Sequence, residues 1–115
     1  MGLIYLTKPA TPDELRMMAE AHVSRIKFAV DVERSVAVGG GELHADCEAA
    51  LLEDGSSQEH VWGAHINLET GEVMCESMIN LRPSHGNPSL EVRDKRTRDR
   101  VESLIRHFIG EVPSA

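Results

Sequence analysis

Apolar and polar residues alternate with a period of two through most of the middle of this chain, and this feature restricts its fold more than any other. The alternation runs through residues 26–38 and again through residues 62–81. Successive side chains of a β-strand point to opposite faces of the sheet, so this period predicts strands with one buried face. Near the ends, at residues 12–23 and 94–108, apolar residues recur at the helical spacing instead. We therefore expect strands in the middle of the chain and a helix near each end.

Capping and turn residues set the bounds of these elements. Thr11 and Glu14 form a capping box that starts the first helix, over residues 12–23. Asp94 is placed to cap the last helix, and Gly110 ends it. The strands that the alternation predicts are residues 3–6, 26–32, 36–38, 43–52, 62–68 and 73–81.

Residues 43–52 carry two conflicting signals. Alanine and glutamate are frequent in this segment, and both favour a helix. Apolar residues nevertheless occupy every second position from Leu43 to Leu51, which is the pattern of a strand. Because periodicity is a stronger signal than intrinsic propensity, we predict a strand here.

The order of the elements predicts an α+β fold. Strands and helices do not alternate regularly, so we expect a mainly antiparallel sheet of four to six strands, with an N-terminal and a C-terminal helix packed on one face. The chain has 115 residues, of which 41% are hydrophobic and 27% are charged. These values are typical of a soluble globular protein with one domain, which we expect to span residues 1–115.

Charge and composition exclude some classes of protein. The net charge of −7 argues against nucleic acid as a partner, and no apolar run is long enough to cross a membrane. The first ten residues lack the features of a secretory signal, and Cys47 and Cys75 are expected to be reduced, so we predict a cytoplasmic location. A basic run in the last helix spreads around its solvent side and is interpreted as a solvated surface: Arg93, Lys95, Arg96, Arg98 and Arg100.

Polar residues of the predicted sheet suggest a site for a metal or for catalysis. On a strand, His44, Asp46 and Glu48 would project from one face, and His65 would join them from the neighbouring hairpin. Imidazole and carboxylate groups bind zinc, manganese or iron, and they can position a water molecule for hydrolysis. A solvated sheet face explains the same residues without any function, and we favour it. No cofactor is predicted, and a divalent metal is the alternative, with His44, Asp46 and His65 as candidate ligands.

The loop SMINLRPSHGNPS, residues 77–89, is a second candidate region. Pro83 ends the preceding strand because it has no amide donor, and the small polar residues that follow are typical of a turn. In a functional interpretation, Arg82 would bind a carboxylate or phosphate, and His85 would transfer a proton. We expect an exposed Arg82 at the mouth of this loop and a buried Trp62. The candidate catalytic residues are His44, Asp46, Glu48, Arg82 and His85.

Two stretches, GGGELHADCEAALLEDGSSQEHVWGA and SMINLRPSHGNPS, carry a resemblance to a known family. In these stretches the chain resembles a family of small bacterial proteins known only as a domain of unknown function. The resemblance spans nearly the whole chain and implies a compact single domain. It implies no established activity, so no catalytic residue can be taken from it.

No group of residues here is specific enough to name a reaction. We therefore expect a small soluble cytoplasmic module for binding or interaction, which self-associates through an exposed strand edge. The alternative is a metal-dependent hydrolase, or another small-molecule enzyme, that uses the polar sheet face. The small-molecule ligand is not identified by the sequence, and neither is enzymatic activity.

Overall fold

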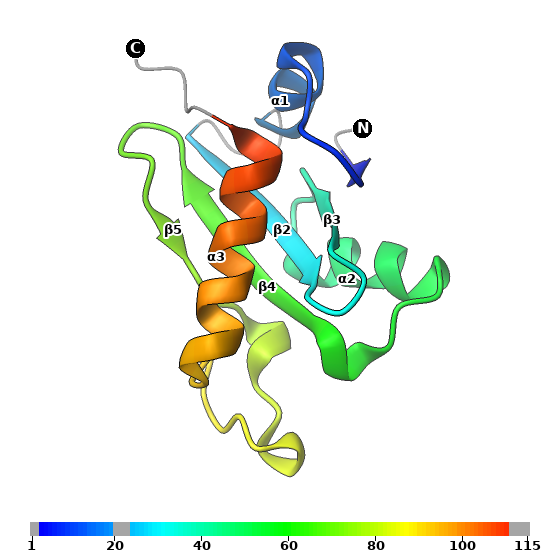
Figure 1. Cartoon of the computed structure of the whole chain (residues 1–115), viewed down its shortest axis with the longest axis vertical. Coiled ribbons are helices and arrows are strands. Elements are labelled where there is room, and N and C mark those ends of the chain that lie inside the picture. Colours follow the sequence, from blue (N-terminus) through cyan, green and yellow to red (C-terminus); the bar gives the residue numbers. More distant parts are fainter. Residues whose placement is uncertain (1–2, 20–23, 111–115) are drawn as a thin grey trace.

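Five strands form one sheet in the computed structural model, which describes residues 3–19 and 24–110 (Figure 1). Neighbouring strands are antiparallel, and their order across the sheet is β1-β3-β2-β4-β5. This confirms the predicted antiparallel sheet. The strands are β1 (Ile4–Leu6), β2 (Arg25–Asp31), β3 (Val36–Gly39), β4 (Val61–Asn67) and β5 (Val73–Met74).

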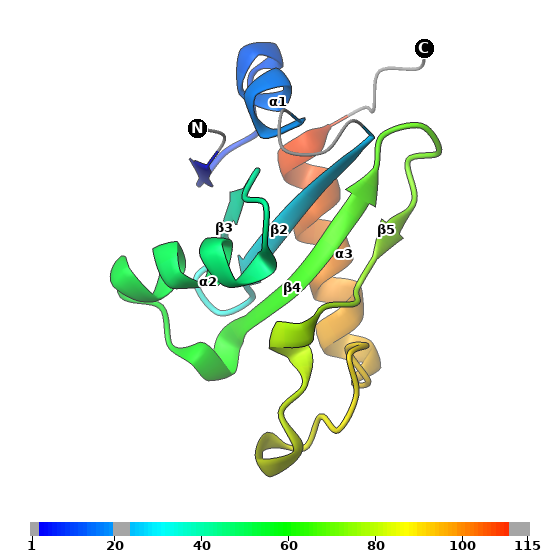
Figure 2. The ribbon, with the colours of Figure 1, turned by 180° about the vertical axis from the view of Figure 1, so that it is seen from behind.

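Helices cover both faces of the sheet. Helix α3 (Lys95–Ile109) crosses one face in Figure 1, and α2 (His44–Glu53) lies on the other face in Figure 2. The first helix, α1, spans Pro12–Met18, and the rest of its predicted length includes residues 20–23, which lie outside the described residues. The predicted caps are confirmed: Thr11 and Glu14 form a capping box, and Asp94 accepts a hydrogen bond from the Thr97 amide at 2.9 Å.

Two apolar clusters hold these layers together. The larger lies between the sheet and α3, where Phe28 and Val30 of β2 pack with Phe108, and α1 adds its buried Met18. The smaller lies between the opposite sheet face and α2, and includes Ala29 of β2. Adjacent residues of β2 therefore belong to different clusters, as the period of two requires. The fold is α+β, with the first and last helices contributing to one cluster.

The strand predicted over residues 43–52 is wrong, because this segment forms helix α2. The apparent period of two depended on treating alanine as a core residue, yet Ala45 and Ala49 are exposed. The buried residues of the segment are Cys47 and Leu51, which are four apart and so share one side of a helix. Alanine has the highest helix propensity, and here that preference prevails.

The strand predicted over residues 73–81 is too long, because β5 ends at Met74 and a short 3-10 turn, η3, occupies Met78–Asn80. Beyond β5, two side chains occupy the edge of β4. The Asn80 amide accepts from Gly63 N at 2.8 Å and donates to Gly63 O at 2.9 Å, while Arg82 Nη2 donates to Val61 O. These bonds satisfy backbone groups that would otherwise need another strand.

No helix in residues 3–19 or 24–110 is long and apolar enough to cross a membrane.

Candidate functional site

Helix α2 separates the residues that a strand would have placed together. His44 and Glu48 are four residues apart and share one side of the helix, whereas the exposed Asp46 lies on another. The His44 ring centroid is 6.4 Å from that of His65, and His44 Nε2 lies 2.9 Å from Ala64 O. In the part of the chain that the structure describes, no three His, Cys, Asp or Glu side chains gather to hold a metal ion. The metal site predicted from His44, Asp46 and His65 stays a prediction; of these three residues, His44 and His65 lie close together.

Arg82 is buried, so its predicted exposure at the loop mouth is wrong. Only 8% of the residue is exposed. Its Nε donates to Ile79 O at 3.0 Å, and its Nη2 donates to Val61 O. The physical reason is that the edge of β4 is not paired with β5 at Val61, so the Val61 carbonyl is left to accept a hydrogen bond from the Arg82 side chain.

Trp62 of β4 contacts the side chain of Arg82. The Arg82 Cζ atom lies 4.8 Å from the centroid of the indole ring, within the range of a cation–π interaction. Trp62 packs against the larger apolar cluster but is half-buried, so the prediction of a buried tryptophan is only partly met. The guanidinium is thus held by two carbonyls and an aromatic ring.

Glu48 of α2 places a carboxylate beside this guanidinium. Its Oε2 is 3.5 Å from Arg82 Nη2, and 14% of its side chain is exposed. Burial lowers the pKa of the Arg82 guanidinium, and the negative charge of Glu48 opposes that effect. Within the described residues, Arg82 Nη1 and Glu48 Oε2 have no hydrogen-bond partner. The pair therefore keeps one unused donor and one unused acceptor.

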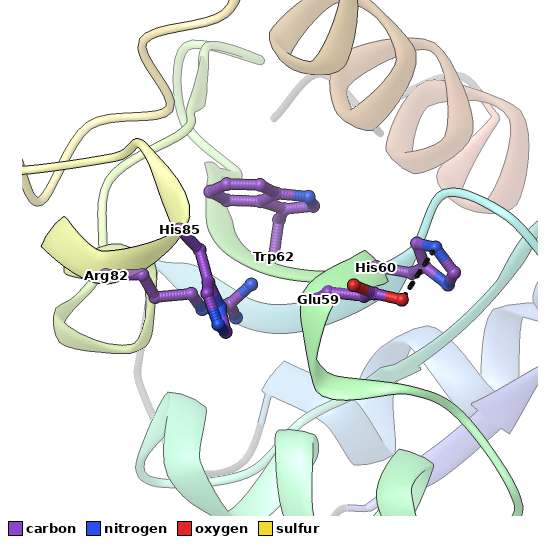
Figure 3. A pocket seen from close by; sticks show the side chains of 5 residues that line it. All are labelled: Glu59, His60, Trp62, Arg82 and His85. Carbon is purple, nitrogen blue, oxygen red and sulfur yellow. Dashed lines mark ion pairs between the residues drawn. The ribbon is translucent and has the colours of Figure 1, made fainter.

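Two adjoining pockets open beside Arg82; Arg82 and His85 line both of them, and Glu48 lines only the second. The first has a volume of about 450 Å³. Figure 3 shows Trp62 between Arg82 and His85 on one side and Glu59 and His60 on the other. The Glu59 carboxylate is 3.7 Å from His60 Nε2. The second pocket, of about 360 Å³, is lined by Glu48, Gln58 and the loop from Met78 to His85.

The loop that carries Arg82 and His85 is fixed by a second buried asparagine. Asn87 Nδ2 donates to Asn80 O at 2.8 Å and to Glu91 O at 2.9 Å, and Asn87 Oδ1 accepts from Arg93 N at 3.0 Å. A bridge between Arg82 and Asn87 closes the turn, as predicted for this segment. The exposed His85 therefore stands on a loop with a buried polar base.

Sequence reasoning missed several residues of this site. Glu59 and His60 follow a turn and gave no signal of a pocket. Asn80 lies in the segment predicted as a strand over residues 73–81, and Asn87 lies in the predicted turn after Pro83, but both are buried. An asparagine beside glycine or proline indicates a turn, but the sequence does not report which backbone groups its amide will bind.

The two cysteines make poor nucleophiles. Both are free thiols. Burial raises the pKa of the Cys47 thiol, and burial followed by the charge of Glu102 raises the pKa of Cys75 to about 11. Because the thiolate is the reactive form, neither residue is activated near neutral pH.

Comparison with known proteins identifies a family but no activity. Residues 4–108 match the family model described as "Protein of unknown function (DUF5674)". No curated protein and no solved structure matches the chain significantly. The matched range includes both stretches that carry the resemblance, residues 39–64 and 77–89.

Proposed function

The chain belongs to this family of proteins of unknown function, and we propose that it is a binding module that takes a small, polar, planar ligand into the pockets beside Arg82. The observation that carries the proposal is the Arg82 guanidinium. It is buried and held in place, yet its Nη1 has no acceptor within the described residues.

A fixed polar group in a pocket favours binding. Contacts with Ile79 O, Val61 O and the Trp62 ring hold the guanidinium, so little side-chain entropy is lost when a ligand arrives. A buried donor without an acceptor is unfavourable by about 1 to 3 kcal/mol. A ligand oxygen at Nη1 would relieve that penalty.

The shape of the site suits a planar molecule. The first pocket, at about 450 Å³, lies within the range of about 300 to 1,000 Å³ that is usual for small-molecule sites. Trp62 offers an aromatic surface, and His60 and His85 offer ring nitrogens around it. An aromatic wall with a few fixed polar groups is typical of pockets that orient a flat ligand.

Self-association and a cytoplasmic location are part of the same proposal. Strand β1 lies at the outer edge of the sheet; Tyr5 within it is 41% exposed, and Leu3, which precedes it, is 44% exposed. Such an edge can pair with another chain. Light scattering across the micromolar range tests self-association, and a strict monomer would contradict it.

The two free thiols, Cys47 and Cys75, support a location in a reducing compartment.

The metal-dependent hydrolase has weaker support. It rests on the proximity of His44 and His65, with Asp46 exposed elsewhere on the helix. Metal analysis of protein purified without an affinity tag tests it. No bound metal, together with no thermal shift on adding zinc or manganese, would exclude that function.

NMR spectroscopy tests the binding proposal directly. Trp62 is the only tryptophan and lines the first pocket, so a single indole N–H signal reports on that pocket. The probes are benzamide, benzoate and phenyl phosphate at millimolar concentration, and we expect at least one to shift this signal in a saturable manner. His85→Ala should weaken that binding by about three- to tenfold, as expected for one lost hydrogen bond.

The matched control is His107→Ala, since His107 is also exposed but lies on α3 and lines neither pocket. It should leave binding unchanged. A Trp62 signal that no probe moves would contradict the proposed function.

A further inference from the structure

The Arg82–Glu48 pair has an unusual combination of unmet hydrogen bonds. Three buried side-chain atoms lack a hydrogen-bond partner within the described residues, and two of them are Arg82 Nη1 and Glu48 Oε2. One is a donor and the other an acceptor. Both residues line the second pocket, so the chemistry of its ligand is restricted by the pair rather than by Arg82 alone.

Charge argues against a simple anion at this site. The guanidinium stays protonated in proteins, and the Glu48 carboxylate lies 3.5 Å from its Nη2. An anion that approached Arg82 would therefore also approach a negative charge at close range. Like charges in a poorly solvated site repel strongly, so the pair favours a neutral ligand over a carboxylate or phosphate.

Geometry then selects a particular neutral group. The unused acceptor, Glu48 Oε2, lies 3.5 Å from Arg82 Nη2, and the unused donor, Nη1, belongs to the same guanidinium. A ligand that bonded to both atoms would present an oxygen and an N–H side by side. A primary carboxamide or a lactam has this arrangement. A trans peptide bond does not, because its C=O and N–H point in opposite directions.

We propose that this site recognises the amide edge of a primary carboxamide or a lactam, with Arg82 donating to the ligand oxygen and Glu48 accepting from the ligand N–H. The inference rests on the proposed function. Both atoms belong to residues that line the pocket, and each has under 1 Å² of exposed area. The exposed His85 and Leu81 line the same pocket, and exposed side chains change rotamer within nanoseconds; the proposal requires such a movement to open the two atoms to the ligand.

Three matched probes test the inference through dissociation constants measured from NMR titrations. Benzamide presents the C=O and N–H on one side, N-methylbenzamide moves its N–H to the opposite side, and benzoate replaces the donor with a second charged oxygen. We expect benzamide to bind about tenfold more tightly than either of the others, which is the effect of one hydrogen bond to a charged group. A fourth probe, 2-pyridone, is a lactam and distinguishes the two ligand classes. If it binds more tightly than benzamide, the ligand is a lactam; if it binds more weakly, the ligand is a primary carboxamide.

A substitution of Glu48 tests the role of the pair. Glu48→Gln removes the negative charge and leaves Arg82 uncompensated, so benzoate should bind more tightly than benzamide in this variant. Glu53→Gln is the matched control, because Glu53 is an exposed residue of the same helix that lines neither pocket. It should keep the wild-type preference.

The outcomes separate this inference from the proposed function. Tighter binding of benzoate or phenyl phosphate than benzamide to the wild-type protein would overturn the amide inference and leave the binding module intact. Equal binding of benzamide and N-methylbenzamide would also overturn it. No binding of any probe would overturn both. The wild-type comparison needs no variant, so it holds even if Glu48→Gln fails to fold.

Discussion

Replacing Arg82 with alanine should destabilise the fold severely. The change removes the hydrogen bonds to Ile79 O and Val61 O, and it leaves Glu48 without its counter-charge. An unsatisfied buried polar group is unfavourable by about 1 to 3 kcal/mol, and removal of one partner from a buried ion pair by about 3 to 5 kcal/mol. These effects overlap because they share one side chain. We therefore expect the free energy of unfolding to fall by about 3 to 5 kcal/mol.

Urea unfolding followed by far-UV circular dichroism measures this loss. Arg82→Lys should recover part of it, since lysine keeps the charge beside Glu48 but lacks the planar fork that reaches two carbonyls. Arg93→Ala is the control. The Arg93 side chain is exposed, so its removal should change stability by no more than about 0.5 kcal/mol.

A double-mutant cycle isolates the ion pair. If Glu48 is destabilising once Arg82 is gone, the combination of Arg82→Ala and Glu48→Ala should lose less stability than the sum of the single changes. A loss for Arg82→Ala no larger than that for Arg93→Ala would refute the reasoning, because the guanidinium would then not lie in the folded interior.

Three further predictions concern the same region and the thiols. Asn80→Ala should lower the free energy of unfolding by about 2 to 4 kcal/mol in urea, because it leaves both Gly63 N and Gly63 O buried without a partner; a loss below about 1 kcal/mol would argue against these bonds. Gly63→Ala should lower the melting temperature, since an added Cβ would lie 2.6 Å from Ser77 Cβ and force the loop away; an unchanged melting temperature would show that the loop moves freely. The pKa of Cys75 is raised to about 11 from 9.0, mainly by burial, so the folded state holds this proton more tightly than the unfolded state. Stability should therefore fall as pH rises from about 9 through 11, and Cys75→Ala should reduce that fall in a pH series of urea titrations.

Periodicity predicted most of the fold, but it failed in α2, where alanine is abundant, and it made the strand over residues 73–81 too long. Most core residues of β2 and α3 are large, and their spacing identifies strand and helix. In α2, alanine fits a period of two and a period of 3.6 equally well, and only Cys47 and Leu51 mark the buried side. Leu43, which completed the apparent strand pattern, is 59% exposed. The helix propensity of alanine favours the period of 3.6, and burial of Cys47 and Leu51 on one side of the helix agrees with it.

The candidate site was predicted in its parts but not in its assembly. Glu48, Arg82 and His85 were all candidates, yet the sequence placed Glu48 on a sheet face and Arg82 at an exposed loop mouth. The partners that bury Arg82 are backbone carbonyls of Val61 and Ile79, which carry no sequence signal. The pocket arises because a helix and a loop, far apart in sequence, meet at the edge of one strand.

Side chains of the loop over residues 77–89, rather than a neighbouring strand, bond to the edge of β4 at Val61 and Gly63. This affects how evolutionary variation in the loop should be interpreted. Asn80, Arg82 and Asn87 bond to backbone groups, so selection for folding alone would restrict substitution at these positions. Invariance of such polar residues among relatives would resemble the signature of an active site even in a protein without catalysis. His85 is different, because its exposed side chain makes no hydrogen bond within the described residues. Retention of this histidine across the family would therefore be the better evidence of selection for a ligand.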